Sequence, residues 1–272
     1  MKQPAPGDHR EIDLGTVAAV ADRGLHHHRN EDAFAIAQVD LSDAVVRIIV
    51  VCDGVSSTAD AHIAAQAAAD AACAILRTVT TSDSTAFAAL TADAIAGAQL
   101  AASAVPAKDG VTPSCTIVTA IASISRVPAR TAETTEAAVT VGWLGDSRSY
   151  WMRGRELRQL SVDDSWASEQ IAAGMPADDA YNDTRAHIIT RWLGADATEL
   201  VPHIETLHVP RPSTLLLCSD GLWNYAPTTQ ALADRIAEQG ALSSNLALAR
   251  ALTNFARDAG GHDNITVALA NL

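Results

Sequence analysis

The 272-residue chain carries 32 acidic side chains against 19 lysines and arginines, so its formal net charge is −13. The negative net charge argues against nucleic-acid binding, which needs a basic face. An apolar content of 48% excludes a disordered or fibrous chain. The length suits one domain, which we predict over residues 1–272 as a monomer. The sequence has no run of about 18 uncharged apolar residues, and residues 1–10 lack the apolar stretch of a secretory signal. We therefore expect a cytoplasmic protein that does not associate with a membrane.

The N-terminal half predicts three strands, then two helices, then two more strands. Short apolar stretches bounded by polar residues are typical of strands, and they occur at 12–20, 33–39, 45–52, 114–124 and 137–144. A polar loop at 22–32 separates the first two strands, and 126–131 is expected to form a hairpin loop. An alanine-rich helix at 60–79 precedes a second helix, capped by Ser82 or Ser84 and ending near Ala104. Two successive helices exclude a strict alternation of strand and helix.

The C-terminal half predicts a hairpin, an irregular segment and a final group of strands and helices. The hairpin pairs 149–152 with 157–160, and residues 162–186 predict one short helix plus an excursion. The remaining strands are expected at 200–209, 214–219 and 265–269, and the remaining helices at 228–239 and 243–259. Mostly antiparallel strands with paired helices indicate an α+β fold, a β-sandwich flanked by helices.

The four cysteines predict buried, reduced thiols. They are widely spaced in apolar surroundings and form no Cys-x-x-Cys pair, which argues against zinc binding and against a disulfide framework. They are Cys52, Cys73, Cys115 and Cys218.

Carboxylates recur where predicted strands begin or end. Any single one of them is most simply a turn residue or a helix cap. Several of them beside buried strands indicate convergence, and converging carboxylates repel one another unless they are protonated or bound to cations. Oxygen ligands of this kind favour Mg²⁺ or Mn²⁺ over Zn²⁺. The positions are Asn30-Glu31-Asp32, Asp53-Gly54, Asp146, Asp220-Gly221 and Asp263-Asn264.

The order of these motifs resembles the metal-dependent Ser/Thr protein phosphatases of type 2C, including their bacterial members. Each motif alone is weak, but the ordered set is specific and extends over about residues 12–270. Its members are Asn30-Glu31-Asp32, Val51-Cys52-Asp53-Gly54, Leu144-Gly145-Asp146-Ser147-Arg148, Leu160-Ser161-Val162-Asp163, Ile189-Thr190-Arg191-Trp192-Leu193-Gly194, Cys218-Ser219-Asp220-Gly221-Leu222-Trp223 and Asp263-Asn264-Ile265-Thr266.

The resemblance implies a four-layer α-β-β-α sandwich with two mainly antiparallel sheets and a metal centre at one edge. It implies two or three Mn²⁺ or Mg²⁺ ions, with Asp53 bridging two of them and the Gly54 carbonyl binding one. Asp220 and Asp263 would hold the second ion, and Asp146 would join Asp220 at the third.

Further roles follow from the same resemblance. Glu31 and Asp32 would orient water at the metals, and Asn264 would support the Asp263 loop. The segment 163–190 would form a flap beside the active site.

The implied activity is hydrolysis of phosphoserine and phosphothreonine in proteins, with a Ser/Thr kinase as the opposing enzyme. An alternative is a pseudophosphatase that binds a phosphoprotein or partner without turnover. Hydrolysis of a small phosphoester also stays open, since such a metal centre contacts only the phosphoryl group.

The chain departs from the family on the phosphate side of the site. The family usually places a phosphate-binding arginine four residues before Glu31, where this chain has His27. Either His27 or Arg29 would then bind phosphate. Val55 stands where some relatives carry a histidine that acts as general acid. Protonation of the leaving group would therefore come from water or from a histidine such as His62 or His26.

Overall fold

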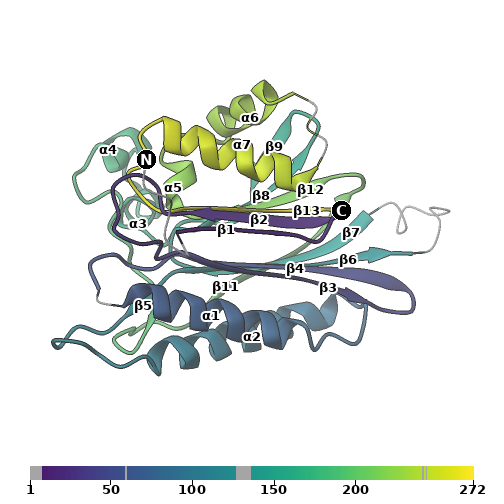
Figure 1. Ribbon diagram of the computed structural model, residues 1–272, viewed down its shortest axis with the longest axis horizontal. Helices are drawn as coiled ribbons and strands as arrows, with labels where there is room; N and C mark the ends of the chain where they lie inside the picture. The colour runs from purple at the N-terminus through teal and green to yellow at the C-terminus, as the bar shows by residue number, and fades with distance from the viewer. Residues whose placement is uncertain (1–7, 59, 127–135, 241, 243) are drawn as a thin grey trace.

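Two antiparallel sheets lie face to face between two groups of helices (Figure 1). The computed structural model describes residues 8–58, 60–126, 136–240, 242 and 244–272. The predicted hairpin loop at 126–131 lies outside these residues except for Arg126, as does Ser243 at the predicted start of the last helix.

The first sheet has five strands, all in antiparallel pairs. Both faces of its central strands are buried, which explains why β4 and β6 are nearly continuous apolar runs. Its order is β11 (His203–Pro210), β7 (Glu136–Leu144), β6 (Ile117–Ser125), β4 (Ala44–Cys52) and β3 (Ala33–Asp40).

The second sheet has six strands, again all antiparallel. Its order is β1 (His9–Asp13), β2 (Val17–Asp22), β13 (Ile265–Asn271), β12 (Thr214–Cys218), β8 (Arg148–Arg153) and β9 (Glu156–Gln159). A short pair of β5 (Ser114–Cys115) and β10 (Leu193–Gly194) lies apart from both sheets.

Helices α1 (Ala61–Leu76) and α2 (Thr85–Ser103) cover the five-stranded sheet. Small side chains such as Ala65, Ala68 and Ala72 allow α1 to lie close to the strands. By length and composition alone α2 could cross a membrane, but its face that includes Phe87 and Ile95 belongs to the core beneath the sheet. That composition therefore serves a core helix here.

Helices α6 (Thr229–Glu238) and α7 (Asn245–Asp258) cover the six-stranded sheet, and α5 (Asp220–Trp223) is a single turn after β12. Thr228 and Ser244 cap α6 and α7 by accepting hydrogen bonds from backbone N–H groups. Three separate apolar clusters fill the spaces between the four layers. The predicted α-β-β-α sandwich is therefore confirmed.

Two predicted strands are each divided in the structure. The strand expected at 12–20 is a hairpin of β1 and β2, with a turn in which Gly15 has a φ of 79° and donates its N–H to Asp13. The strand expected at 114–124 breaks at Thr116, whose N–H bonds the Asp53 carbonyl instead of a ladder partner. In both places a hydrogen bond outside the ladder accompanies the break, within the turn at Gly15 and to the distant Asp53 at Thr116.

The expected short helix plus excursion after 162 is instead two helices, α3 (Trp166–Ala172) and α4 (Ala177–Tyr181). They pack through the small cluster of Ala167, Ala180 and Ala186. Both lie within the predicted flap 163–190, whose role, like the single-domain assignment, stays a prediction.

Candidate functional site

The predicted site residues lie where strands of both sheets end at one edge of the sandwich. The β4 residue Cys52 pairs with Ala33 of β3, so Asp53 and Asp32 leave neighbouring strand ends. In the other sheet Cys218 pairs with Val267, which brings the residues after β12 next to those before β13. Antiparallel neighbours thus carry carboxylates from distant parts of the sequence to one edge.

Asp53 and Gly54 form a tight bend between β4 and the loop that follows. The Asp53 carbonyl accepts a hydrogen bond from Thr116 N–H at 2.8 Å, and Asp53 N–H donates to Thr116 Oγ1 at 3.3 Å. A Cβ at Gly54 would lie 2.6 Å from the Glu31 carbonyl, so only glycine allows this approach. The bend therefore holds Asp53 and the Glu31 backbone side by side.

Asp32 is tied to the opposite sheet by two hydroxyl groups. Its Oδ2 accepts from Ser219 Oγ at 2.7 Å and from Thr266 Oγ1 at 2.8 Å, while its buried Oδ1 has no hydrogen-bond partner. Ser219 directly precedes Asp220, so Asp32 fixes the backbone that presents Asp220. Sequence reasoning assigned no role to Ser219 or Thr266, although both stood in the recognised motifs.

Asn264 joins the loop before β3 to the loop before β13. Its Oδ1 accepts from Glu31 N–H at 2.7 Å, and its Nδ2 donates to the Arg23 and Arg29 carbonyls at 2.8 and 3.1 Å. Its own N–H bonds Asp263 Oδ1 at 2.7 Å. Asn264 thus holds the 23–31 loop as well as the predicted Asp263 loop.

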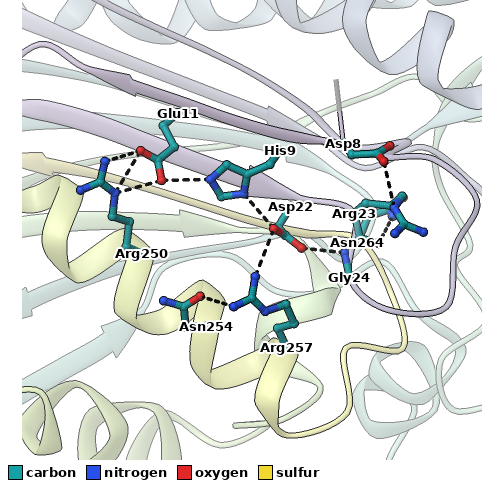
Figure 2. Close-up of polar contacts among 10 residues, drawn as sticks. All are labelled: Asp8, His9, Glu11, Asp22, Arg23, Gly24, Arg250, Asn254, Arg257 and Asn264. Atoms are coloured by element: carbon teal, nitrogen blue, oxygen red, sulfur yellow. Dashed lines mark hydrogen bonds and ion pairs between the residues drawn. The ribbon is translucent and has the colours of Figure 1, made fainter. Parts of the chain in front are cut away.

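The start of the 23–31 loop is fixed from α7 and β1 (Figure 2). Asp22 accepts from Gly24 N–H at 2.9 Å, and its Oδ2 contacts His9 Nδ1 at 2.8 Å and Arg257 Nη1 at 3.8 Å. Arg23 pairs with Asp8 at 3.2 Å. A loop anchored at this many points is preorganised to carry a binding site.

Burial and mutual repulsion raise the pKa values of the converging carboxyls. Burial, then repulsion by Asp32, Asp220 and Asp263, raises the pKa of Asp53 well above its usual range. Burial and then Asp263 raise the pKa of Asp220 to about 6, against hydrogen bonds that lower it. Burial raises the pKa of Asp32 to about 7, although hydrogen bonds from Ser219 and Thr266 lower it.

Asp146 belongs to the same electrostatic group. Burial and then repulsion by Asp220 raise its pKa well above the usual range. Its neighbour Arg148 forms a buried, bidentate pair with Asp163, with Nη2–Oδ2 at 2.7 Å, and lies over the Trp223 ring at 3.7 Å. Trp223 Nε1–H donates to the Asp146 carbonyl at 2.9 Å. Arg148 therefore links the Asp146 loop to Asp163, at the start of the predicted flap.

A bound cation fits this donor set. The buried Oδ1 atom of Asp220 lacks a hydrogen-bond partner, and a cation would satisfy this oxygen and remove the repulsion between the carboxylates. Within the part of the chain that the structure describes, no three His, Cys, Asp or Glu side chains are arranged to hold a metal ion as they stand. A cation would therefore compete with protons for these carboxyls, since burial and mutual repulsion raise their pKa values.

The histidines and arginines of the 23–31 loop lie beside the group of converging carboxylates. His27 Nε2 is 3.1 Å from Asp263 Oδ1, and the His27 carbonyl accepts a hydrogen bond from Arg23 Nη1. Arg29 Nη1 lies 3.2 Å from the ring nitrogens of His62, whose pKa is lowered by burial and then by Arg29. His26 stacks on His262 with ring centroids 4.4 Å apart. Both candidate general acids are therefore engaged with neighbouring side chains.

Comparison with known proteins shows the family. The profile of the protein phosphatase 2C family matches residues 24–256, which include Glu31, Asp32, Asp53, Asp146 and Asp220 but not Asp263. The chain belongs to the protein phosphatase 2C family.

Bacterial members of the protein phosphatase 2C family are similar in sequence over part of the chain. The serine/threonine phosphatase stp of Listeria monocytogenes is 36% identical over 137 residues, which is 49% of this chain and 52% of that protein. Protein phosphatase PhpP of Streptococcus pneumoniae is 35% identical over 133 residues, 47% of this chain and 51% of that protein. The chain thus spans about half the length of the curated relatives that it matches.

Solved structures of protein phosphatase 2C relatives share the fold over nearly the whole chain. The serine/threonine phosphatase PstP/Ppp of Mycobacterium tuberculosis superposes with a TM-score of 0.72 at 24% identity, covering 94% of this chain and 97% of that one. The S. agalactiae serine/threonine phosphatase gives 0.72 at 22% identity, with 93% and 97% covered.

Replacing Asn264 by alanine is expected to destabilise the protein by about 2–4 kcal/mol, because three buried or half-buried backbone groups lose a partner at once. Chemical denaturation would measure the change in the free energy of unfolding. Asn254, on the exposed face of α7, makes one hydrogen bond to Arg257 and serves as the matched control (Figure 2). Equal stability of Asn264→Ala and Asn254→Ala would show that Asn264 does not hold the loops.

Proposed function

We propose that this chain hydrolyses phosphoserine and phosphothreonine esters of proteins at a centre of two or three Mn²⁺ or Mg²⁺ ions. The observation that carries the proposal is the group of buried carboxyls with raised pKa values, among them Asp53, Asp146 and Asp220. Strong perturbation by both burial and like charges is typical of functional sites. Family membership supports the chemical class.

Asp53, the Gly54 carbonyl, Asp220 and Asp263 would hold two ions, and Asp146 with Asp220 a third. When bound, such ions polarise the phosphoryl group, lower the pKa of water and neutralise charge that develops on the phosphoryl oxygens. No covalent nucleophile is required of the protein. The thiols suit this assignment, because burial raises the pKa of Cys52 and of Cys218 and keeps both protonated.

The chain's own polar groups would position the reactants. Asp32 is held through Oδ2 by the Ser219 and Thr266 hydroxyls, so its unpartnered Oδ1 is available to accept a hydrogen bond from the attacking water. Glu31 is placed next to Asp53 by the contact of its backbone with Gly54 and would orient a second water. Fixed acceptors of this kind reduce the reorganisation needed in the transition state.

His27 would bind the phosphoryl group from the loop side, with Arg29 next to it. Phosphoproteins produced by a Ser/Thr kinase would be the substrates. Hydrolysis of p-nitrophenyl phosphate and of a phosphothreonine peptide with added Mn²⁺ tests the proposal. No rate above background with either substrate would refute it. Stoichiometric metal content without turnover would then distinguish a damaged enzyme from a binding-only pseudophosphatase, which need not hold two catalytic ions.

Replacing His27 by alanine is expected to lower kcat/KM for the phosphothreonine peptide by about tenfold, through loss of one phosphate contact near Asp263. His27→Arg should match or exceed the unaltered chain, because guanidinium is always charged and binds phosphate through two nitrogens. Steady-state kinetics at saturating Mn²⁺ would measure both. His208 is exposed on β11, so His208→Ala is the control. An unchanged kcat/KM in His27→Ala would exclude His27 from phosphate binding.

A further inference from the structure

A cavity opens beside the carboxylate group, on the side of the 23–31 loop. It has a volume of about 360 Å³, and its lining includes Arg29, Ser56, Asp60 and Lys108 together with Glu31 and His27. Glu31 and His27 also belong to the site described above, so the two sites are continuous. The cavity contains both stretches where the chain departs from its family, the His27 loop and the segment after Val55.

Two cations in this cavity form only long pairs with its carboxylate Asp60, and Arg29 also contacts the His62 ring at 3.2 Å. Arg29 Nη1 lies 4.0 Å from Asp60 Oδ1, and Lys108 Nζ lies 4.0 Å from Asp60 Oδ2. The side chains of Arg29 and Lys108 are 56% and 61% exposed, whereas that of Asp60 is 30% exposed. Pairs this long and this exposed contribute little stability. The Asp60 carboxylate therefore pairs weakly with both cations, and both remain accessible to an anion that binds them more strongly.

The backbone holds Lys108 and Asp60 in place. Lys108 and Val111 exchange both backbone hydrogen bonds, at 3.0 and 2.9 Å, around a two-residue turn in which Asp109 and Gly110 have positive φ. This is the pattern of a tight type I′ hairpin turn. Asp60 has a φ of 61°, and among the described non-glycine residues only Asp60 and Asp109 lie in this left-handed region. Aspartate tolerates this conformation better than most residues, so it places Asp60 directly before α1 and between the two cations.

The charge of the whole chain makes this cavity unusual. The sequence has a net charge of −13 and contains only two lysines, of which Lys108 is one. A strongly acidic surface repels anionic peptides, so exposed cations next to the reacting group would offset that repulsion locally. Glu31 and Asp60 line the same cavity, and Asp60 is the carboxylate that pairs with both cations. An incoming anion would displace Asp60 from both of them.

We propose that Arg29 and Lys108 form a recognition subsite for a second anionic side chain of the phosphopeptide, next to the phosphorylated residue. The proposal rests on the proposed function and names the substrate class of that site, which is a phosphopeptide with a neighbouring acidic or phosphorylated residue. In the free protein the Asp60 carboxylate pairs with Arg29 and Lys108, so it competes with the peptide and sets the affinity of the subsite for the peptide.

Binding of non-hydrolysable peptides tests the subsite without relying on turnover. Three labelled peptides carry a phosphonate analogue of phosphothreonine, flanked by alanines, by two glutamates on its N-terminal side or by two glutamates on its C-terminal side. Fluorescence anisotropy with Mg²⁺ at low salt gives the dissociation constants. We expect one glutamate peptide to bind about fivefold tighter than the alanine peptide, and the difference to shrink at about 0.5 M salt. A phosphonoserine in place of the glutamates shows whether a carboxylate or a second phosphoryl group is preferred.

Variants separate the subsite from a general charge effect. Lys108→Glu should abolish the preference for the glutamate peptide, and Lys108→Arg should keep it. Asp60→Asn should increase it about twofold to fivefold, because asparagine tolerates the left-handed backbone and no longer competes. Arg155→Ala removes an exposed cation on the β8–β9 turn and should leave the preference unchanged.

Equal affinity of all three peptides would overturn the proposal, as would a preference that persists in Lys108→Glu or falls in Asp60→Asn. A charge-dependent preference without hydrolysis of the phosphothreonine peptide would uphold the subsite and refute the proposed activity. Hydrolysis of the phosphothreonine peptide with no preference among the three peptides would uphold the proposed activity and overturn the subsite.

Discussion

Asp53→Ala and Asp220→Ala are each expected to abolish Mn²⁺-dependent hydrolysis, by about 10³-fold or more in kcat/KM. Both carboxyls are buried in the same repelling group, where burial and then neighbouring carboxylates raise the pKa of each. Removing either leaves too few oxygen ligands to bring two cations together. Steady-state kinetics with p-nitrophenyl phosphate over a range of Mn²⁺ concentrations measures the effect.

Neutralising Asp53 is expected to stabilise the metal-free protein. Taking away one buried carboxyl relieves repulsion, so Asp53→Asn should unfold at a higher temperature than the unaltered chain in EDTA at pH 8. Asp70 is an exposed carboxylate on α1, and Asp70→Ala should change neither the activity nor the melting temperature appreciably. Full activity in Asp220→Ala would contradict the assignment of Asp220 as a metal ligand.

Metal binding is expected to raise the melting temperature, and to raise it more at pH 8 than at pH 5. At a metal concentration about 100 times the dissociation constant the stabilisation is about 3 kcal/mol, or about 6–12 °C for a chain of this size. The ions must displace protons from carboxyls with raised pKa values, and at pH 8 fewer such protons remain. Differential scanning fluorimetry with and without Mn²⁺ at each pH gives the difference directly.

The direction of the pH effect follows from two pKa values. Asp220 and Asp32 have pKa values of about 6 and about 7 in the folded chain, both above the ordinary 3.8. Below about pH 4 both are protonated in either state, so their contribution to stability is fully present. It is lost as the pH rises through about 6 to 7, because only the unfolded chain ionises freely. A metal effect that is largest at pH 5 would contradict a carboxylate site.

Groups elsewhere act in a different pH range. The hydrogen bond to Arg250 lowers the pKa of Glu11 to about 2, so the stability that Glu11 contributes is present above about pH 4.5 and is lost as the pH falls toward 2. The Glu11–Arg250 pair ties β1 to α7 (Figure 2). Comparing samples with and without metal at one pH cancels such contributions.

Local sequence predicted the fold class and the metal side of the site. Apolar stretches ended by polar residues located β4 and β12, and Asp53 and Asp220 directly follow them. Each of these signals lies within a few neighbouring residues, because side-chain alternation and turn chemistry are local. The ordered motifs could therefore be recognised, and the family was confirmed from residues 24–256.

The sequence by itself determined which carboxylates exist and that strand ends carry them. Only the tertiary structure decided what surrounds them. The hydroxyls of Ser219 and Thr266 bond Asp32, and the side chain of Asn264 bonds three backbone groups. Asp60 lies between the cations of Lys108 and Arg29. These partners are dozens to more than two hundred residues apart in the sequence, and each bond depends on the register of two sheets and on how they stack. A hydroxyl or an amide has no local pattern that names a distant partner, so these contacts arise only when the layers pack together.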